Sequence, residues 1–185
     1  MQLDAQDFLR LVESNKSLGF VDIESTGFRG DYNSVLVVSV LPFHGLPESF
    51  AVKQPGNDEK VVKDAKRAME KLDAWVTYYG KGFDIPMLNT RLLKWGLTPI
   101  NPRPHIDMYY SLKYALLTSR HSQSHLLSWL QTPEQKMGVS ADVWASISRN
   151  PKKYMPEMIE RCESDCKGLQ DLYDKTKHLI KDIKR

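Results

Sequence analysis

Two carboxylates, Asp22 and Glu24, end an apolar run and are followed by Ser25-Thr26-Gly27. The apolar residues 18–23 predict a buried β-strand that stops at this turn signal. Because alternate side chains of a strand share a face, both carboxylates point the same way. Like charges at this spacing raise each other's pKa unless a cation lies between them, and their hard oxygens suit Mg²⁺ or Mn²⁺. Two interpretations are open: a metal site, or an Asx-turn at Asp22 beside a solvated Glu24.

Two more acids lie where predicted elements begin or pack. Asp84 follows a predicted strand and the loop 80–82, whose glycines let a ligand approach the backbone. Its alternative role is to cap the helix that is expected to begin near residue 83. Asp165 borders an apolar helix stripe, and an acid beside a core face needs a partner or a metal ion. The stripe consists of Met155, Ile159, Cys162, Cys166, Leu169 and Tyr173.

The hydrophobic pattern predicts the elements that must position these acids. We expect strands over residues 18–23, 35–41, 49–54 and 74–79, and a short strand or helix start over 105–108. Helices are expected over 4–15, 58–72, 83–95, 110–117, 124–130, 141–147 and 151–180, with Asp58 as the cap of the second. The turn residues make the first three strands an antiparallel meander. The element order predicts one α/β domain, residues 1–185, with helices packed on a mixed sheet.

Composition limits the functional classes. The chain has 185 residues, 41% hydrophobic and 26% charged, and a net charge of +3, which permits nucleic-acid binding without requiring it. Cys162 and Cys166, four apart on a helix, are expected to be reduced core residues. We find no signal-peptide pattern and no run long enough to span a membrane. An intracellular, cytoplasmic protein without membrane contact is expected.

Aromatic and histidine side chains offer further candidates. Phe28 and Tyr32, in the loop after the first two acids, are placed to stack on a terminal base. His121 and His125 have a zinc-like spacing, but no third ligand with matching geometry is evident. The tryptophans are interpreted as core residues; they are Trp75, Trp95, Trp129 and Trp144.

Three segments together resemble the DEDD superfamily of 3′–5′ exonucleases. They are Phe20-Val21-Asp22-Ile23-Glu24-Ser25-Thr26-Gly27, then Tyr78-Tyr79-Gly80-Lys81-Gly82-Phe83-Asp84-Ile85-Pro86-Met87-Leu88, then Cys162-Glu163-Ser164-Asp165. The resemblance covers nearly the whole chain and looks closest to the proofreading domains of family B DNA polymerases and related stand-alone nucleases. It implies a ribonuclease-H-like fold, in which a three-strand antiparallel meander and parallel strands form one mixed sheet flanked by helices.

The resemblance also implies an activity. Asp22, Glu24, Asp84 and Asp165 would be the catalytic acids that hold two Mg²⁺ or Mn²⁺ ions. The expected reaction is phosphodiester hydrolysis that removes nucleotides from single-stranded 3′ ends, of DNA more than of RNA. A separate polymerase, or a replication or repair protein, is the expected further partner. The residues expected to bind the substrate are Ser25, Thr26, Phe28, Tyr32, Phe83 and Arg161.

Two departures from the family pattern bear on mechanism. Tyr79 stands where the family often has Asn, and the family's Tyr or His before the last acid is replaced by Arg161 or Glu160. Arginine stays protonated and cannot act as a base. Its positive charge means that Arg161 would repel the metal ions or bind a phosphate. Glu160 is the expected proton acceptor, and otherwise the base would be His105, His121 or His125. The alternative is a degenerate pseudo-nuclease that binds nucleic acid without cleaving it.

Overall fold

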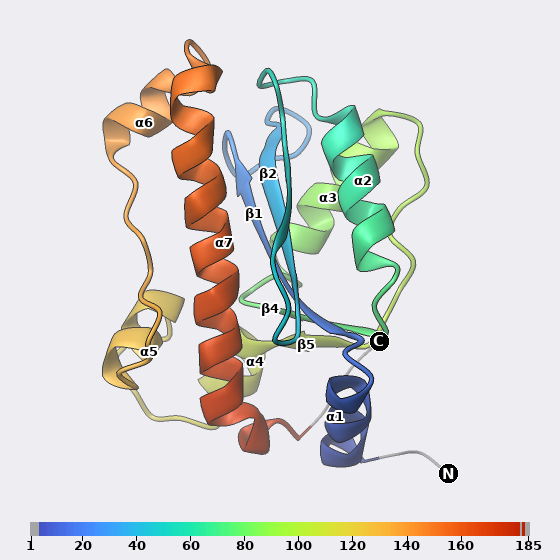
Figure 1. Cartoon of the computed structure of the whole chain (residues 1–185), viewed down its shortest axis with the longest axis vertical. Helices are drawn as coiled ribbons and strands as arrows, with labels where there is room; N and C mark the ends of the chain where they lie inside the picture. The colour runs from blue at the N-terminus through green and yellow to red at the C-terminus, as the bar shows by residue number, and fades with distance from the viewer. Residues whose placement is uncertain (1–3, 182, 184–185) are drawn as a thin grey trace.

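The sheet has five strands in the order β3-β2-β1-β4-β5 in the computed structural model, which describes residues 4–181 and 183 (Figure 1). The strands are β1 (Leu18–Ser25), β2 (Val35–Pro42), β3 (Glu48–Ala51), β4 (Ala74–Thr77) and β5 (His105–Asp107). Strands β1, β2 and β3 pair antiparallel as a meander, and β4 and β5 extend the sheet in parallel from β1. The predicted fold class is therefore confirmed.

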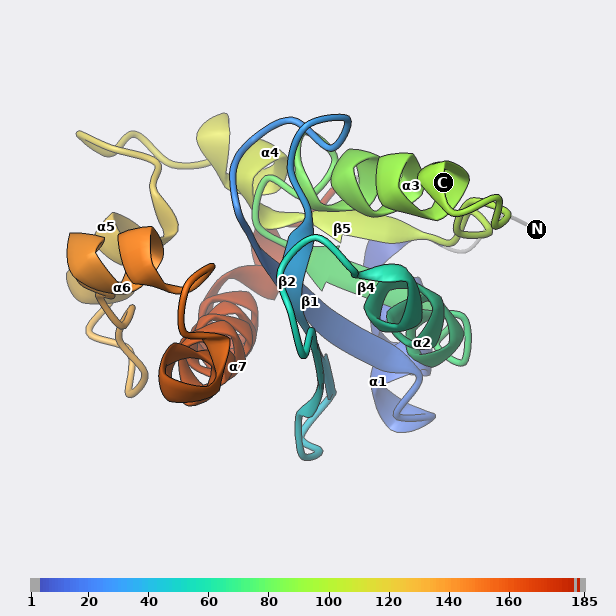
Figure 2. The ribbon, with the colours of Figure 1, turned by 90° about the horizontal axis from the view of Figure 1, so that it is seen from above.

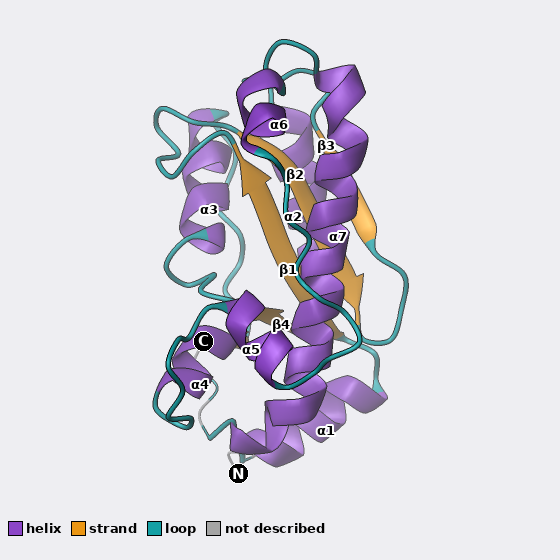
Figure 3. Ribbon diagram, turned by 90° about the vertical axis from the view of Figure 1, so that its left-hand side faces the viewer, coloured by secondary structure: helices purple, strands orange, loops and turns teal. Residues whose placement is uncertain are grey.

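Helices cover both faces of this sheet. In Figure 2, α2 (Glu59–Met69) and α3 (Asp84–Lys94) lie on one side of the strands and α7 (Pro151–Thr176) lies on the other. Figure 3 looks onto the face with α7, which crosses in front of the long strands β1 and β2. The remaining helices are α1 (Ala5–Ser14), α4 (Met108–Lys113), α5 (Gln123–Trp129), α6 (Ala141–Ser146) and the 3₁₀-helix η1 (Lys177–Leu179).

Alternation along β1 divides its side chains between the two faces. Val21 and Ile23 belong to the apolar core that includes the buried residues of α2 and α3, whereas Phe20 packs edge-on against Tyr173 of α7. Because a strand has a period of two, Asp22 and Glu24 share the Phe20 face and point toward α7. The strand thus directs two carboxylates at one helix.

Helix α7 carries its apolar stripe against the sheet, as the spacing predicts. Met155, Leu169 and Tyr173 are buried, and Cys162 and Cys166 are free, buried thiols, as expected. Burial of this face stabilises the helix more than intrinsic propensity does. The acid that borders the stripe is consequently drawn to the sheet.

Asp58 is the N-cap residue of α2, but its side chain makes no capping hydrogen bond. Its carboxylate is fully buried and accepts hydrogen bonds from Arg91, Trp95 and the backbone N–H of Val35. Burial alone would raise the pKa of Asp58, but these hydrogen bonds outweigh it and lower that pKa. The ion pair with Arg91 connects the start of α2 to α3, and the hydrogen bond from Val35 connects it to β2.

Some predicted bounds and environments differ from the structure. The fifth strand and α4 meet at residues 107 and 108, so the segment 105–108 contains both a strand and a helix start. Trp75 is buried, but Trp129 is exposed at the end of α5, so the core interpretation was wrong for Trp129. A helix this short presents little surface to the core, and its last residue faces solvent.

Candidate active site

Three carboxylates from opposite ends of the chain meet between β1 and α7. Asp22, Glu24 and Asp165 each offer an oxygen, and these three atoms lie within 4.8 Å of one another. Glu24 and Asp165 are buried, and Asp22 is half-buried. Such a group of hard oxygen ligands could bind a divalent metal ion.

Asp84, the first residue of α3, lies beside this group. Its side chain is buried, and burial is the main cause that raises the pKa of Asp84 to about 7. The backbone N–H groups of Asp84 itself and of Ile23 act in the opposite direction. After burial itself, the charges of Asp165, Asp84 and Glu24 raise the pKa of Asp22. The four acids singled out in the sequence therefore interact with one another.

Another buried acid, Asp107, holds the loop that leads to Asp84. Its two carboxylate oxygens accept hydrogen bonds of 2.9 Å from the backbone N–H groups of Tyr79 and Lys81. Gly80 lies so close to Thr77 that a Cβ there would approach its Oγ1 to 2.3 Å. Asp107 had no predicted role; its position at the end of a short strand was the available signal.

Two basic side chains contact the acids. Arg161 Nε donates a hydrogen bond of 2.5 Å to Glu24 Oε1, and Lys136 Nζ lies 2.8 Å from Asp165 Oδ2. Although burial lowers the pKa of Lys136, the charges of Asp165 and Asp22 outweigh it and raise that pKa. Lys136 was not singled out from the sequence, because it lies in an irregular loop without a periodic pattern.

The donor set retains the capacity to bind a metal ion. Asp165 Oδ1 is buried, and it has no hydrogen-bond partner among the residues that the structure describes. A buried oxygen without a partner is costly, and a divalent cation would satisfy it. The residues present therefore fit a Mg²⁺ or Mn²⁺ site.

A cavity of about 550 Å³ opens over the acids. Its lining includes Asp22, Asp84, Lys136, Phe28 and Phe83. The rings of Phe28 and Phe83 meet edge to face with centroids 6.0 Å apart, and Phe28 is largely exposed. An acidic floor with an aromatic wall could hold a phosphate and a planar base.

Three other residues expected to bind the substrate, Ser25, Thr26 and Tyr32, lie at the end of β1 and in the loop that follows it. Ser25 Oγ donates to the carbonyl of Gly27, and Thr26 Oγ1 accepts a hydrogen bond from the backbone of Ser34. Tyr32 is exposed. Within residues 4–181, the lining of the acidic cavity does not include these three predicted residues.

A family model of the RNase H superfamily matches residues 19–177, which contain all four acids and the sheet except Leu18, the first residue of β1. The chain belongs to the RNase H superfamily. Domains of this superfamily are typically nucleases, and the fold implies a nucleic-acid substrate. No curated protein matches the chain.

A solved structure with the same fold as this RNase H domain is the family B DNA polymerase from the hyperthermophilic archaeon Pyrobaculum calidifontis. The match has a TM-score of 0.64 and 17% sequence identity, and it covers 86% of this chain. It covers 24% of the polymerase chain, so the RNase H domain spans about a quarter of that protein's length. At this identity the likeness concerns the fold.

In this RNase H domain, the three histidines considered as alternative bases contact groups other than the four acids. His105 Nε2 lies 2.7 Å from Thr77 Oγ1, and burial, with a contribution from Lys81, lowers the pKa of His105 to about 4. His121 Nε2 lies 3.1 Å from the carbonyl oxygen of Leu116, and His125 Nε2 lies 3.3 Å from Ser119 Oγ.

Glu160 is exposed on α7, and its neighbour Arg161 is the residue that reaches the acids. The role of Glu160 as proton acceptor stays a prediction.

Within the described part of the chain, no helix is long and apolar enough to cross a membrane.

Proposed function

We propose that this RNase H domain is a metal-dependent 3′–5′ exonuclease that removes nucleotides from single-stranded ends, of DNA in preference to RNA. The observation that carries the proposal is the group of Asp22, Glu24 and Asp165 oxygens within 4.8 Å of one another, with Asp84 beside them. Solvated surface acids would not be drawn together at the edge of a core.

Asp22, Glu24, Asp84 and Asp165 would hold two Mg²⁺ or Mn²⁺ ions. Bound ions supply Lewis-acid charge to the scissile phosphate and lower the pKa of water. The chain's own residues fix where this chemistry happens, because Asp22 and Glu24 are held by β1 while Asp165 is held by α7. Such rigid placement favours a geometry near that of the reaction.

Lys136 and Arg161 would contact phosphates of the substrate once metal ions bind the acids. In the free protein they neutralise Asp165 and Glu24. A divalent ion at the same oxygens would repel both basic groups, and their long side chains would then be free to contact phosphates. Arg161 is thereby proposed as a phosphate-binding residue.

The aromatic side chains that line the acidic cavity favour a single-stranded substrate. Phe28 and Phe83 line the cavity beside Asp22 and Asp84, where they could stack on the terminal base. An unpaired base can separate from its neighbours and present its face to an aromatic side chain, which favours single strands over duplexes. Ser25, Thr26 and Tyr32 would extend the contact along the loop after β1.

A digestion assay tests this function. The protein is incubated with Mg²⁺ or Mn²⁺ and with 5′-labelled single strands of DNA and of RNA of the same sequence. We expect a ladder that shortens from the 3′ end, faster on DNA, and none for Asp22→Asn. Release of internal fragments, or equal degradation by wild type and Asp22→Asn, would contradict the proposal.

The second candidate is a pseudo-nuclease, which the two ion pairs favour. If Lys136 and Arg161 stay on Asp165 and Glu24, they replace the metal ions and leave a site that binds nucleic acid without cleaving it. This candidate predicts that the protein binds single-stranded nucleic acid but releases no nucleotide in the presence of Mg²⁺ or of Mn²⁺. The same assay, with binding measured in parallel, separates the two functions.

A further inference from the structure

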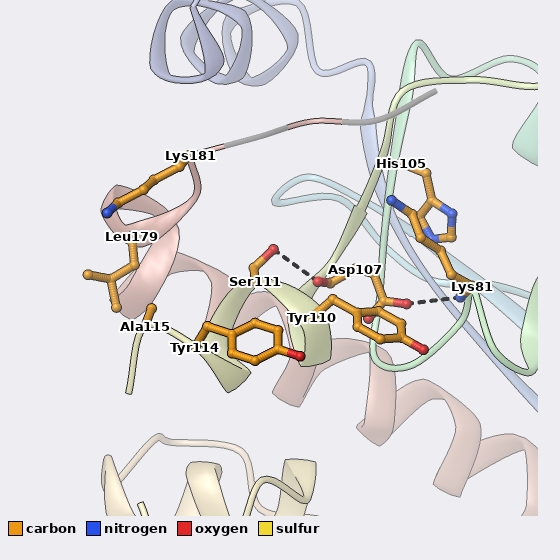
Figure 4. A pocket seen from close by; sticks show the side chains of 9 residues that line it. All are labelled: Lys81, His105, Asp107, Tyr110, Ser111, Tyr114, Ala115, Leu179 and Lys181. Atoms are coloured by element: carbon orange, nitrogen blue, oxygen red, sulfur yellow. Dashed lines mark hydrogen bonds between the residues drawn. The ribbon is translucent and has the colours of Figure 1, made fainter. Parts of the chain in front are cut away.

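A second cavity, of about 590 Å³, lies on the other side of the loop after β4 (Figure 4). Its lining draws on that loop, on β5 and α4, and on the segment that follows α7. The residues that matter here are Lys81, Asp107, Tyr110, Tyr114 and Lys181. None of these was given a role in the proposed hydrolysis.

Tyrosine rings connect this cavity to the acidic one. Tyr79 lines the acidic cavity and Tyr110 lines the second, and their ring centroids are 5.9 Å apart with planes inclined by 31°. Tyr109 packs against both rings, with its ring centroid 5.2 Å from each. Figure 4 shows Tyr110 of α4 and Tyr114, the residue directly after α4, at the edge of the cavity. The aromatic surface therefore continues from one cavity to the other.

The rings of Tyr79, Tyr110 and Tyr114 are exposed to solvent. The exposed fractions are 45% for Tyr79, 44% for Tyr110 and 84% for Tyr114. Tyr79 also has a left-handed backbone, with φ of 64°, which is strained for a bulky residue. Its ring lies over Gly82, where a Cβ would approach the ring to 2.6 Å. A strained and exposed aromatic residue gains little for stability, which points to a ligand.

The charge around the tyrosines is positive. The Lys113 ammonium lies 5.6 Å and 5.5 Å from the ring centroids of Tyr109 and Tyr114. Lys81 and Lys181 belong to the lining of the second cavity. Among the described residues that line this cavity, Asp107 is the one with a carboxylate, and it is buried and engaged by backbone N–H groups. Exposed rings beside lysines suit a chain of unpaired bases joined by phosphates.

We propose that Tyr79, Tyr110 and Tyr114 form a stacking track for the single strand whose 3′ end lies at the acids. The track would hold the nucleotides on the 5′ side of that end, and Lys81, Lys113 and Lys181 would contact their phosphates. The direction of the strand rests on the proposed exonuclease function. Stacking on the track itself requires only an unpaired strand.

Binding of oligonucleotides of two lengths tests the track. Fluorescence anisotropy is measured in EDTA, so that no strand is cleaved, with 5′-fluorescein oligo(dT) of 3 and of 12 nucleotides. One stacked base contributes about 5- to 150-fold in affinity. We expect the Tyr110→Ala/Tyr114→Ala variant to bind the 12-mer at least about fivefold more weakly, with unchanged affinity for the 3-mer.

Matched variants separate stacking from other effects. Tyr110→Phe/Tyr114→Phe keeps the rings and should retain wild-type affinity, as should Leu46→Ala, which removes an exposed apolar side chain on the β2–β3 turn. If the double alanine variant does not fold, Tyr114→Ala alone serves, because that ring is the most exposed of the three.

Lys113→Gln should reduce the slope of log affinity against log salt by about 0.7.

Unchanged 12-mer affinity in the alanine variants would overturn the track. So would an equal loss for both lengths, or tyrosine-dependent binding of a 12-base-pair duplex as tight as that of the single strand. Failure of the exonuclease function is seen separately: wild type would release no nucleotide in Mg²⁺ or Mn²⁺, while the dependence of 12-mer binding on the tyrosines would persist.

Discussion

The guanidinium of Arg161 on α7 donates a 2.5 Å hydrogen bond to the carboxylate of Glu24 on β1. It also donates to the carbonyl of Met137, next to the lysine that pairs with Asp165. Two internal cations therefore lie against the acids that we propose as metal ligands. Metal ions must compete with these cations, which makes the free protein and the metal-bound protein different electrostatic states.

Removal of the arginine charge should strengthen metal binding. For Arg161→Gln we expect Mn²⁺ to bind at least about fivefold more tightly, because a unit charge about 4 Å away is worth about 1 kcal/mol even in water. Isothermal titration without nucleic acid measures the affinity. Arg161→Lys keeps the charge and serves as the control. Equal affinities for all three proteins would mean that Arg161 does not compete with the ion.

Divalent metal should raise the melting temperature. An ion that binds only the folded state at 100 times its Kd adds about 2.7 kcal/mol, which for a domain of this size corresponds to a shift of roughly 5–10 °C. Asp22→Asn should abolish the shift, and Asp171→Asn, on the far part of α7, should retain it. A melting curve that Mn²⁺ leaves unchanged in wild type would indicate acids that bind no metal.

Stability without metal should fall as pH rises from about 4 to about 7. Burial raises the pKa of Asp84 from 3.8 to about 7 and raises that of Asp22 as well. In this window the folded state binds more protons than the unfolded state, so the free energy of unfolding decreases with pH, by at most about 1.4 kcal/mol per pH unit for one group. Urea unfolding in EDTA at pH 5 and pH 7.5 measures the difference.

Asp84→Asn should make that pH dependence shallower, because the asparagine carries no titrating proton. The substitution keeps the size of the side chain, so the loop and α3 should be retained. A steeper or unaltered dependence in Asp84→Asn would assign the effect to other groups. Addition of Mn²⁺ should oppose the loss of stability at the higher pH, because the ion favours the ionised carboxylates.

The buried ion pair between Asp58 and Arg91 should contribute strongly to stability. Arg91→Met leaves the Asp58 carboxylate buried without its main partner, which typically costs about 3–5 kcal/mol. Lys60→Gln removes an exposed partner of Asp64 and should change stability by about 0.5 kcal/mol or less. Chemical denaturation of both variants gives the comparison. A loss below about 1 kcal/mol for Arg91→Met would show that Trp95 and Val35 suffice for Asp58.

The fold followed from local patterns. Turn residues between the first three strands predicted the meander, and the apolar stripe of α7 predicted the face that packs on the sheet. Alternation along β1 correctly placed Asp22 and Glu24 on one face. These features depend on residues that are close together in the sequence. The periodicity of apolar and polar residues is therefore enough to predict them.

Contacts between distant segments could not be predicted in the same way. Lys136 reaches Asp165 from an irregular loop, and Asp107 holds Tyr79 from another strand. Asp58 has the sequence context of a helix cap, yet it pairs with Arg91, which lies 33 positions away. In each case tertiary packing decides the partner of a charged side chain, and local propensity does not specify it.

The claim that the acids form a metal centre is tested most directly by anomalous diffraction from crystals soaked in Mn²⁺. We predict two manganese peaks roughly 3.5–4 Å apart, both contacted by Asp22, with Lys136 and Arg161 withdrawn from Asp165 and Glu24. No manganese at these carboxylates in millimolar Mn²⁺, with the Lys136 ammonium still on Asp165, would contradict the account.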